Sequence, residues 1–412
     1  MFTNRERSYF DYGATAPMRA EVLDAYVRAL RETVGNPASQ HSDGQNSRDL
    51  LELARETIAR SFGVTPAEIV FTAGGTEAIN LALKGFYWQR NSAGERPIIL
   101  VAEGEHHATV DTVEWLATSQ GAELVWLPLD AAGVLHPEVL ERAILEHEAA
   151  KIAVITVVLV NNEIGTVQPA QQLQNIADKH GIPLHFDAVA ALGQFPLKNV
   201  LKTACFSVSA HKIGGPVACG ALVLRRKYTP VPLLHGGTQQ RSRSGTQDAP
   251  AAIAFAKAIE IVDRDMCNSQ KRMSQIQQLI LQRIRKLDSG AVLRGSEPVL
   301  WRDYTVDGCA QLPARAFGNL HFTFAGCQGD SLLFLLDQHG VSVSTGSACT
   351  AGVVAISHVC KAIGLPDEVA IGALRITFSA DTSDADVLRL LRALPDSIAA
   401  ARRAGLSSIE TK

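Results

Sequence analysis

The chain has 412 residues, of which 46% are hydrophobic and 20% charged. This length exceeds one simple core, so we expect a large and a smaller domain. A formal net charge of −3 leaves no basic excess, which argues against nucleic acid as a direct ligand. No apolar run reaches membrane-spanning length, and the first residues lack the apolar core of a signal peptide.

The seven cysteines are scattered and form no C-x-x-C pair. This pattern is neither a zinc framework nor a secreted disulfide scaffold, so we expect no metal ion. Free thiols are typical of a reducing compartment, and the predicted location is therefore the cytoplasm.

Strand-like and helix-like segments alternate from about residue 50 to residue 225. Apolar residues at helical spacing from Leu51 to Phe62 predict a helix, followed by a strand over 68–72 and a helix over 76–90. Further short apolar runs occur at Ile98–Ala102, Leu124–Leu127, Ile152–Val160, Pro183–Phe186, Cys205–Ser209 and Gly220–Leu224. Such runs are typical of strands buried on both faces, which predicts an α/β fold with a mainly parallel sheet.

The pattern changes beyond residue 260, where a long polar helix, Ile261–Leu287, is predicted. Shorter elements follow at Leu320–Phe324, Asp330–His339, Val341–Val343 and Leu374–Phe378, before a final helix over about 383–404. We predict a large domain of residues 16–260. Residues 1–15 and 261–412 are expected to form a smaller α+β domain.

Polar motifs follow several of the predicted strands. Residues 71–77, Phe-Thr-Ala-Gly-Gly-Thr-Glu, join a strand to a helix, where free amides and the Thr76 hydroxyl suit a phosphate. An ordinary turn with Thr76 as the helix N-cap fits equally well. The histidines of residues 104–107 suit a ring-stacking proton shuttle or a solvated loop. The asparagines of residues 160–165 would bind a phenolic oxygen or shape a turn.

Asp187 and Lys212 each lie at the end of a strand-like run. A lysine can form a Schiff base with the aldehyde of pyridoxal phosphate, and an aspartate can keep the ring nitrogen protonated. Taken alone, the pair also fits turn chemistry and a surface lysine.

The second half of the chain contributes three candidates. Thr246 lies in the loop 241–246, either as a phosphate ligand or in a solvated basic loop. Arg375 lies within an apolar run, where it would bind a substrate carboxylate or form a structural salt bridge. Small polar residues surround Cys349 in residues 344–352, which favours a nucleophilic thiolate on a mobile loop over a buried, inert cysteine.

In this order the motifs resemble those of the cysteine desulfurases, which are class-V aminotransferases of the fold-type I pyridoxal phosphate-dependent group. The similarity extends from Phe10–Pro17 and Gly35–Ser39 to Arg375, nearly the whole chain. The resemblance implies a mainly parallel large domain with a smaller α+β C-terminal domain. It also implies pyridoxal 5'-phosphate as cofactor and L-cysteine as substrate.

The resemblance assigns roles to individual residues. Lys212 would hold the cofactor and move protons on the substrate, Asp187 would pair with the ring nitrogen, and His106 would stack on the ring. Asn162 would lie near the ring hydroxyl. The phosphate would be held by Gly75, Thr76, Ser209 and His211.

The resemblance also assigns the substrate and partner contacts. Arg375, with Asn36, would bind the cysteine carboxylate. Cys349 would take the sulfur as a persulfide, release alanine and pass the sulfur to a protein acceptor. Thr246 matches a phosphate ligand donated across subunits, which implies a homodimer.

The chain departs from the family pattern at Ala190, where glutamine is usual, and at Val217-Ala218, where Lys-Gly is common. The C-terminal tail is expected to lack the extension with which some members dock scaffold proteins. Two alternatives stay open: a selenocysteine lyase or related lyase without persulfide relay, and a weakly active paralog that acts as a binding partner. The pathway that uses the sulfur is not determined by the sequence.

Overall fold

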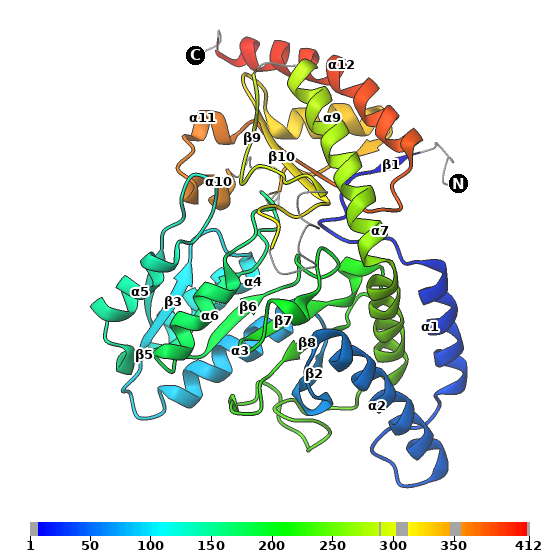
Figure 1. Cartoon of the computed structure of the whole chain (residues 1–412), viewed down its shortest axis with the longest axis vertical. Helices are drawn as coiled ribbons and strands as arrows, with labels where there is room; N and C mark the ends of the chain where they lie inside the picture. The colour runs from blue at the N-terminus through cyan, green and yellow to red at the C-terminus, as the bar shows by residue number, and fades with distance from the viewer. Residues whose placement is uncertain (1–6, 288–289, 302–311, 347–355, 410–412) are drawn as a thin grey trace.

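The computed structural model describes residues 7–287, 290–301, 312–346 and 356–409 (Figure 1). A broad sheet with its helices forms one part of the molecule, and a smaller group of strands and helices lies against one end of it. None of the helices within the described ranges is long and apolar enough to cross a membrane.

The central sheet has seven strands in the order β2-β8-β7-β6-β5-β3-β4. The strands are β2 (Ile69–Thr72), β3 (Ile98–Ala102), β4 (Glu123–Leu127), β5 (Ile152–Val158), β6 (Leu184–Asp187), β7 (Cys205–Ser209) and β8 (Gly220–Val223). The pairs from β4 through β7 are parallel, whereas β8 is antiparallel to both β7 and β2. The sheet is therefore mixed and mostly parallel, as predicted.

The apolar runs of the sequence reflect burial on both faces of this sheet. In β3, Ile98 and Leu100 join a hydrophobic cluster with the helices over residues 42–62, 137–146, 170–179 and 249–287. Ile99 and Val101 join another with the helices over residues 75–90 and 107–120. Burying each such side chain stabilises the fold by roughly 1.5–3 kcal/mol.

The helices of this part are α1 (Ala20–Glu32), α2 (Ser42–Phe62), α3 (Gly75–Arg90), α4 (His107–Gln120), α5 (Pro137–Glu146) and α6 (Ala170–Lys179). Short 3-10 turns lie at Pro66–Glu68, Ala149–Lys151, Leu197–Asn199 and Ala210–Ile213.

The long helix α7 (Ala249–Leu287) starts well before the predicted Ile261. Asp248 accepts a hydrogen bond from the Ala251 amide at 2.9 Å, and Pro250 lies in the first turn, so a capped helix start was encoded there. The first half of α7 packs in the large core, and residues 273–284 pack in the second core. The predicted domain boundary thus falls within one continuous helix, and the division into domains stays a prediction.

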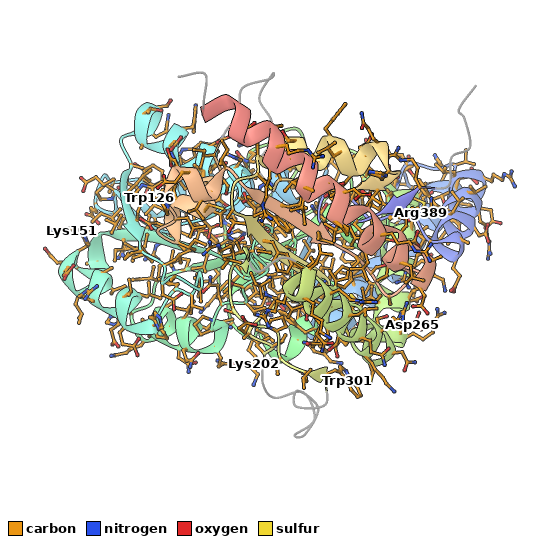
Figure 2. The ribbon with its side chains drawn as sticks, turned by 90° about the horizontal axis from the view of Figure 1, so that it is seen from above. Trp126, Lys151, Lys202, Asp265, Trp301 and Arg389 are labelled. Atoms are coloured by element: carbon orange, nitrogen blue, oxygen red, sulfur yellow. The ribbon has the colours of Figure 1, made fainter. Side chains whose placement is uncertain are left out.

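The second core lies between two small sheets and their helices. Strand β10 (Asn319–Phe324) pairs antiparallel with β12 (Ala373–Thr377) and β9 (Ala291–Leu293), and β1 (Ser8–Tyr9) pairs parallel with β11 (Val341–Ser342). The helices here are α9 (Gly329–Gln338), α10 (His358–Ala362), α11 (Asp367–Ala370) and α12 (Asp384–Ile409). Seen from above, α12 crosses this part, while Lys151, Lys202 and Asp265 point outward at the edges of the molecule (Figure 2).

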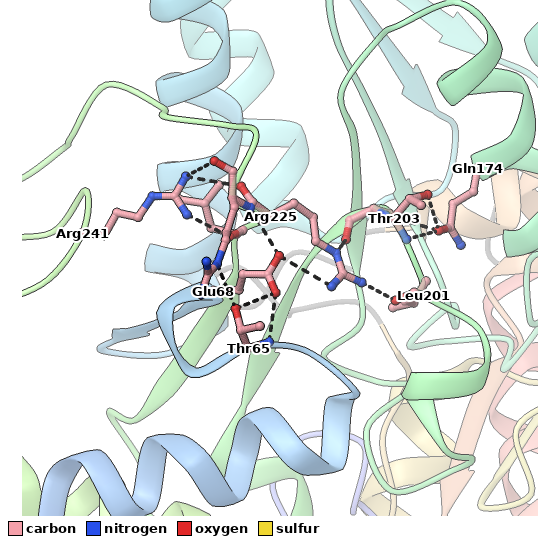
Figure 3. Close-up of polar contacts among 10 residues, drawn as sticks. Thr65, Glu68, Gln174, Leu201, Thr203, Arg225 and Arg241 are labelled. Carbon is pink, nitrogen blue, oxygen red and sulfur yellow. Dashed lines mark hydrogen bonds and ion pairs between the residues drawn. The ribbon is translucent and has the colours of Figure 1, made fainter. Parts of the chain in front are cut away.

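A polar cluster fixes the antiparallel edge of the large sheet (Figure 3). Glu68 accepts hydrogen bonds from the amide and hydroxyl of Thr65 and faces Arg225, whose guanidinium donates to the Leu201 carbonyl. Burial alone would raise the pKa of Glu68, but these hydrogen bonds and the arginine charge hold it below its usual range. The cluster therefore stabilises the end of the sheet where β8 reverses direction.

Candidate active site

A cavity of about 430 Å³ lies beyond the carboxyl ends of β5, β6 and β7, where the second core meets the sheet. Ligands of parallel α/β folds bind at this edge because loops and helix N-termini converge there. The cavity brings together most of the predicted site residues, namely Gly75, Thr76, His106, Asn162, Asp187, Ser209, His211, Lys212 and Arg375.

One end of the cavity is the glycine-rich start of α3. Gly74 has a φ of +139°, a conformation that favours glycine, and precedes the free amides of the helix. A methyl group on Gly75 would lie 2.6 Å from Val189 Cγ2, so only glycine allows this close packing. His211 beside this end has its pKa lowered to about 4 by burial and by the Lys212 charge. Anion binding here therefore rests on amides and hydroxyls rather than on an imidazolium.

Lys212 extends from the 3-10 turn after β7 toward the first residues of the chain. Its ammonium donates hydrogen bonds to the carbonyls of Gly13 and, at 3.0 Å, Ala14. Burial and the Arg375 charge lower the pKa of Lys212 to about 8, although Asp187 and Asp11 oppose the shift. A lysine with this pKa has a sizeable neutral, nucleophilic fraction near neutral pH.

Asp187 ends β6 and is 3% exposed. Its Oδ1 accepts the Val189 amide at 2.9 Å. Burial raises the pKa of Asp187, and the nearby His106 ring, the Val189 hydrogen bond and the Lys212 charge offset this only in part. The carboxylate thus sits at the cavity wall in a low-dielectric setting, where a cationic partner would be held strongly.

His106 is the N-cap of α4, and its Nδ1 accepts the Ala108 amide at 3.0 Å. The proton of the neutral ring must therefore be on Nε2. Burial is the largest influence on the pKa of His106 and lowers it, while Asp187 opposes this shift. The ring is consequently neutral and presents one tautomer to the cavity.

Arg375 joins the two parts of the molecule at the cavity. Its guanidinium pairs with Asp11 at 2.9 Å and donates to the Asn162 carbonyl at 3.0 Å. The salt bridge that the sequence left open is thus present, and the same side chain also lines the cavity. Two buried atoms here have no hydrogen-bond partner within the described part of the chain, Arg375 Nε and Asn162 Oδ1.

No motif in the sequence assigned a role to Asp11 or Glu105. Asp11 lies in the motif Phe10–Pro17, but its arginine partner is too distant in sequence to infer. Glu105 is fully buried next to His106 and accepts the Val158 amide, which ties the end of β3 to β5. Burial and nearby Asp187 raise its pKa to about 8. An acidic residue directly before the motif histidine was the available signal.

Two of the predicted residues, Asn36 and Thr246, are not brought into this cavity. Asn36 is exposed, accepts the Ala38 amide at 2.9 Å and lines a separate hollow with Arg48 and Gln247. Thr246 is exposed and is not among the residues that line the cavity of its own chain. Cys349 lies outside the described residues.

Ala190 lines the cavity and also a neighbouring hollow of about 120 Å³, which reaches Gln194 and Met273. Ala190 and Lys212 both line the cavity and the neighbouring hollow, and Ala190 contributes only a small methyl side chain to this shared wall. The departure from the family glutamine therefore removes a polar group and bulk from the wall that faces Lys212.

Comparisons with known proteins agree with this geometry. The family model for aminotransferase class-V matches residues 8–390. An IscS-like cysteine desulfurase of Mycobacterium tuberculosis is 40% identical over 97% of this chain and 98% of its own length. A cysteine desulfurase IscS of Methanosarcina thermophila is 34% identical, over 96% of this chain and 92% of its own length.

Solved structures give the same result for the fold. A NifS-like protein superimposes with a TM-score of 0.84 at 29% identity, over 96% of this chain and all of its own. SspA, solved in complex with cysteine, has a TM-score of 0.75 at 28% identity, over 91% of this chain and all of its own. The chain therefore belongs to the class-V aminotransferase family. Within that family it belongs with the IscS-like cysteine desulfurases.

Proposed function

We propose that the cavity binds pyridoxal 5'-phosphate, the cofactor that this family implies. The glycine cradle at Gly74 and Gly75 provides free amides for a phosphate. Asn162 Oδ1 is a buried acceptor with no hydrogen-bond partner among the described residues, which suits a ring hydroxyl. Asp187 and Lys212 line the same cavity and suit a pyridine nitrogen and an aldehyde.

The proposed reaction converts L-cysteine to L-alanine and transfers the sulfur to Cys349. Bound pyridoxal phosphate withdraws electrons from the substrate carbons, which is the chemistry that the protein alone lacks. Arg375 orients the substrate carboxylate through its fork. Lys212 moves the proton at the substrate α-carbon, and the neutral His106 assists through Nε2. The thiolate of Cys349 would attack the substrate sulfur, so that an S–S bond forms as the bond between that sulfur and the substrate β-carbon breaks. The electron pair of the broken bond stays with the carbon fragment, which is protonated and released as alanine, and Cys349 is left as a persulfide.

This proposal is supported above all by one observation: Lys212, Asp187 and Arg375 line the same cavity. The cofactor and an amino-acid substrate need a lysine with a pKa near 8, a buried carboxylate and an available guanidinium. The Nε of Arg375 has no hydrogen-bond partner within the described ranges of the chain. A scaffold protein without activity would not require all three.

The decisive experiment measures alanine and sulfide released from L-cysteine in the presence of a reductant. Cys349→Ser should lose at least about a hundredfold in activity, since a persulfide needs a thiolate, while its cofactor absorbance stays intact. Cys267→Ser is the matched control because Cys267 is a free, exposed cysteine on α7. Full activity in Cys349→Ser would indicate a lyase without persulfide relay, and an inactive wild type would favour the weakly active paralog.

We further propose that the enzyme is a homodimer with Thr246 reaching the partner's phosphate site, and that it acts in the cytoplasm. The sulfur acceptor is proposed to be a protein. Iron–sulfur cluster assembly, tRNA thiolation and DNA sulfur modification are the candidate uses of its sulfur. The exposed position of Thr246 outside its own cavity supports a role across subunits.

A further inference from the structure

A second group of chemically active side chains lies apart from the cavity. Glu163 in the segment after β5, His321 on β10 and Cys360 on α10 point to a common centre. Their candidate ligand atoms all lie within 4.8 Å of one another, and each residue is at most 2% exposed. Within the described ranges this is the group of His, Cys, Asp and Glu side chains compact enough to hold a metal ion.

The imidazole of His321 gives an independent sign that a ligand is missing. Both of its ring nitrogens are buried, and neither has a hydrogen-bond partner in the described part of the chain. Leaving a buried polar group unpaired costs about 1–3 kcal/mol. A buried imidazole without a hydrogen-bond partner in the described chain is expected to bind a ligand. Here one of its ring nitrogens lies within 4.8 Å of the Glu163 carboxylate and the Cys360 thiol.

The surroundings orient the other two side chains. The Ser357 hydroxyl donates to Glu163 Oε2 at 2.5 Å and accepts the Cys360 amide at 3.2 Å. Asn161 Oδ1 accepts the Glu163 amide at 2.9 Å. Metal sites in proteins commonly have such hydrogen bonds behind their ligands, because they fix the direction of the donor atoms.

We propose that Glu163, His321 and Cys360 bind one Zn²⁺ ion. A carboxylate, an imidazole and a thiolate form a common zinc ligand set, and tetrahedral coordination places such donor atoms about 3.3–3.5 Å apart. Donor atoms that all lie within 4.8 Å of one another would have to move at most about 1.5 Å closer together to reach this spacing. An ionised carboxylate and a thiolate together would balance the 2+ charge of the ion.

The position of the site defines its role. Glu163 follows Asn162, which lines the cavity and bonds Arg375, while His321 and Cys360 belong to the second core region. A methyl group on Gly346 would lie 3.0 Å from Glu163 Oε2, so the site also lies directly beside the last described residue before position 347. A zinc ion here would hold the sheet edge to the smaller strands at the base of the cavity.

The test uses the full-length holoenzyme, stripped with a chelator, reloaded with ZnCl₂ alone and dialysed. We expect about one tightly held zinc per chain by mass spectrometry, and a higher melting temperature in the loaded protein. His321→Asn and Cys360→Ala should each lower zinc retention at least about tenfold and abolish the shift in melting temperature. Cys205→Ala is the matched control, because Cys205 is equally buried but lies in β7.

Cys349→Ser must keep its zinc, since the proposed ligands do not include Cys349. Zinc lost in Cys349→Ser and kept in Cys360→Ala would overturn the assignment. So would a wild type that retains no more zinc than Cys360→Ala. Co²⁺ binding to Cys349→Ser tests the site while its three proposed ligands stay native. We expect an absorption band from charge transfer between a thiolate and cobalt, and its absence would also overturn the proposal.

Discussion

Lys212 shows how an ordinary residue becomes reactive through its surroundings. Its ammonium is partly buried, faces the carbonyls of Gly13 and Ala14, and lies near the positive charge of Arg375. These factors lower its pKa to about 8, so the neutral amine is available close to physiological pH. The opposing charge of Asp187 prevents a larger shift.

The rate at which the apoenzyme takes up pyridoxal phosphate should therefore depend on pH. The neutral fraction of Lys212 rises through its pKa of about 8, so the rate should increase about fivefold from pH 7 to pH 8 and level off above pH 9. The increase in visible absorbance after mixing measures it. Lys212→Ala should develop no such band at any pH, and a rate that is flat between pH 7 and pH 9 would contradict the assigned pKa.

The Arg375 side chain is expected to contribute to substrate binding rather than to cofactor binding. Arg375→Ala should raise the KM for cysteine about tenfold to a hundredfold, since it removes a charge-assisted hydrogen bond, with kcat and the cofactor band little changed. The mutation also leaves Asp11 unpaired. Adding Asp11→Asn should restore the melting temperature but not the KM. An unaltered KM in Arg375→Ala would remove this residue from the substrate site.

At the scale of elements, the start of α3 determines whether the cavity can hold a phosphate. The turn packs closely against its neighbours. A methyl group added at position 220 would lie 2.8 Å from Gly74 Cα, and one added at position 75 would lie 2.6 Å from Val189 Cγ2. Val189 in turn follows β6, which carries Asp187. The proposed phosphate end and the proposed ring-nitrogen end of the cavity are therefore coupled through one packed contact.

Gly75→Ala should raise the dissociation constant of pyridoxal phosphate at least about tenfold, because overpacking at Val189 displaces the helix N-terminus. The double variant Gly75→Ala, Val189→Ala should recover much of this loss, because the colliding methyl group is removed. Equilibrium titration of apoenzyme with the cofactor compares the two. Equal losses in the single and double variants would show that the clash is not the cause.

At the scale of the whole molecule, the cavity depends on chain segments that are far apart in sequence. Gly13 and Ala14 follow β1, Lys212 follows β7, and Arg375 lies on β12. The long helix α7 packs in both hydrophobic cores and fixes their relative position. The proposed dimer extends this principle, since Thr246 would complete the site of the partner.

Co-expression of two inactive variants tests the dimer. If Thr246 acts across subunits, a heterodimer of Lys212→Ala and Thr246→Val contains one fully native site and should regain about half of the wild-type activity. Each homodimer should have low activity by the alanine assay. If Thr246 acts within its own chain, the heterodimer has no native site and stays as weak as the homodimers. Full activity in Thr246→Val alone would remove this residue from the phosphate site.

Local features of the sequence were enough to predict the α/β class, the positions of most strands and the main candidates of the cavity. Continuous apolar runs, glycines before a helix and polar residues after strands are determined by neighbours in the chain, so they are visible without a structure. The same reasoning placed Lys212, Asp187 and His106 at strand ends, and the structure brings them to one edge of the sheet.

Contacts between distant segments were decided by the tertiary structure alone. The pairing of Arg375 with Asp11 and the antiparallel insertion of β8 depend on the path of the chain. The cluster of Glu163, His321 and Cys360 is the clearest case, because its members lack any metal-binding spacing in the sequence. Such groups meet only when separate elements are packed together, and no local pattern encodes that arrangement.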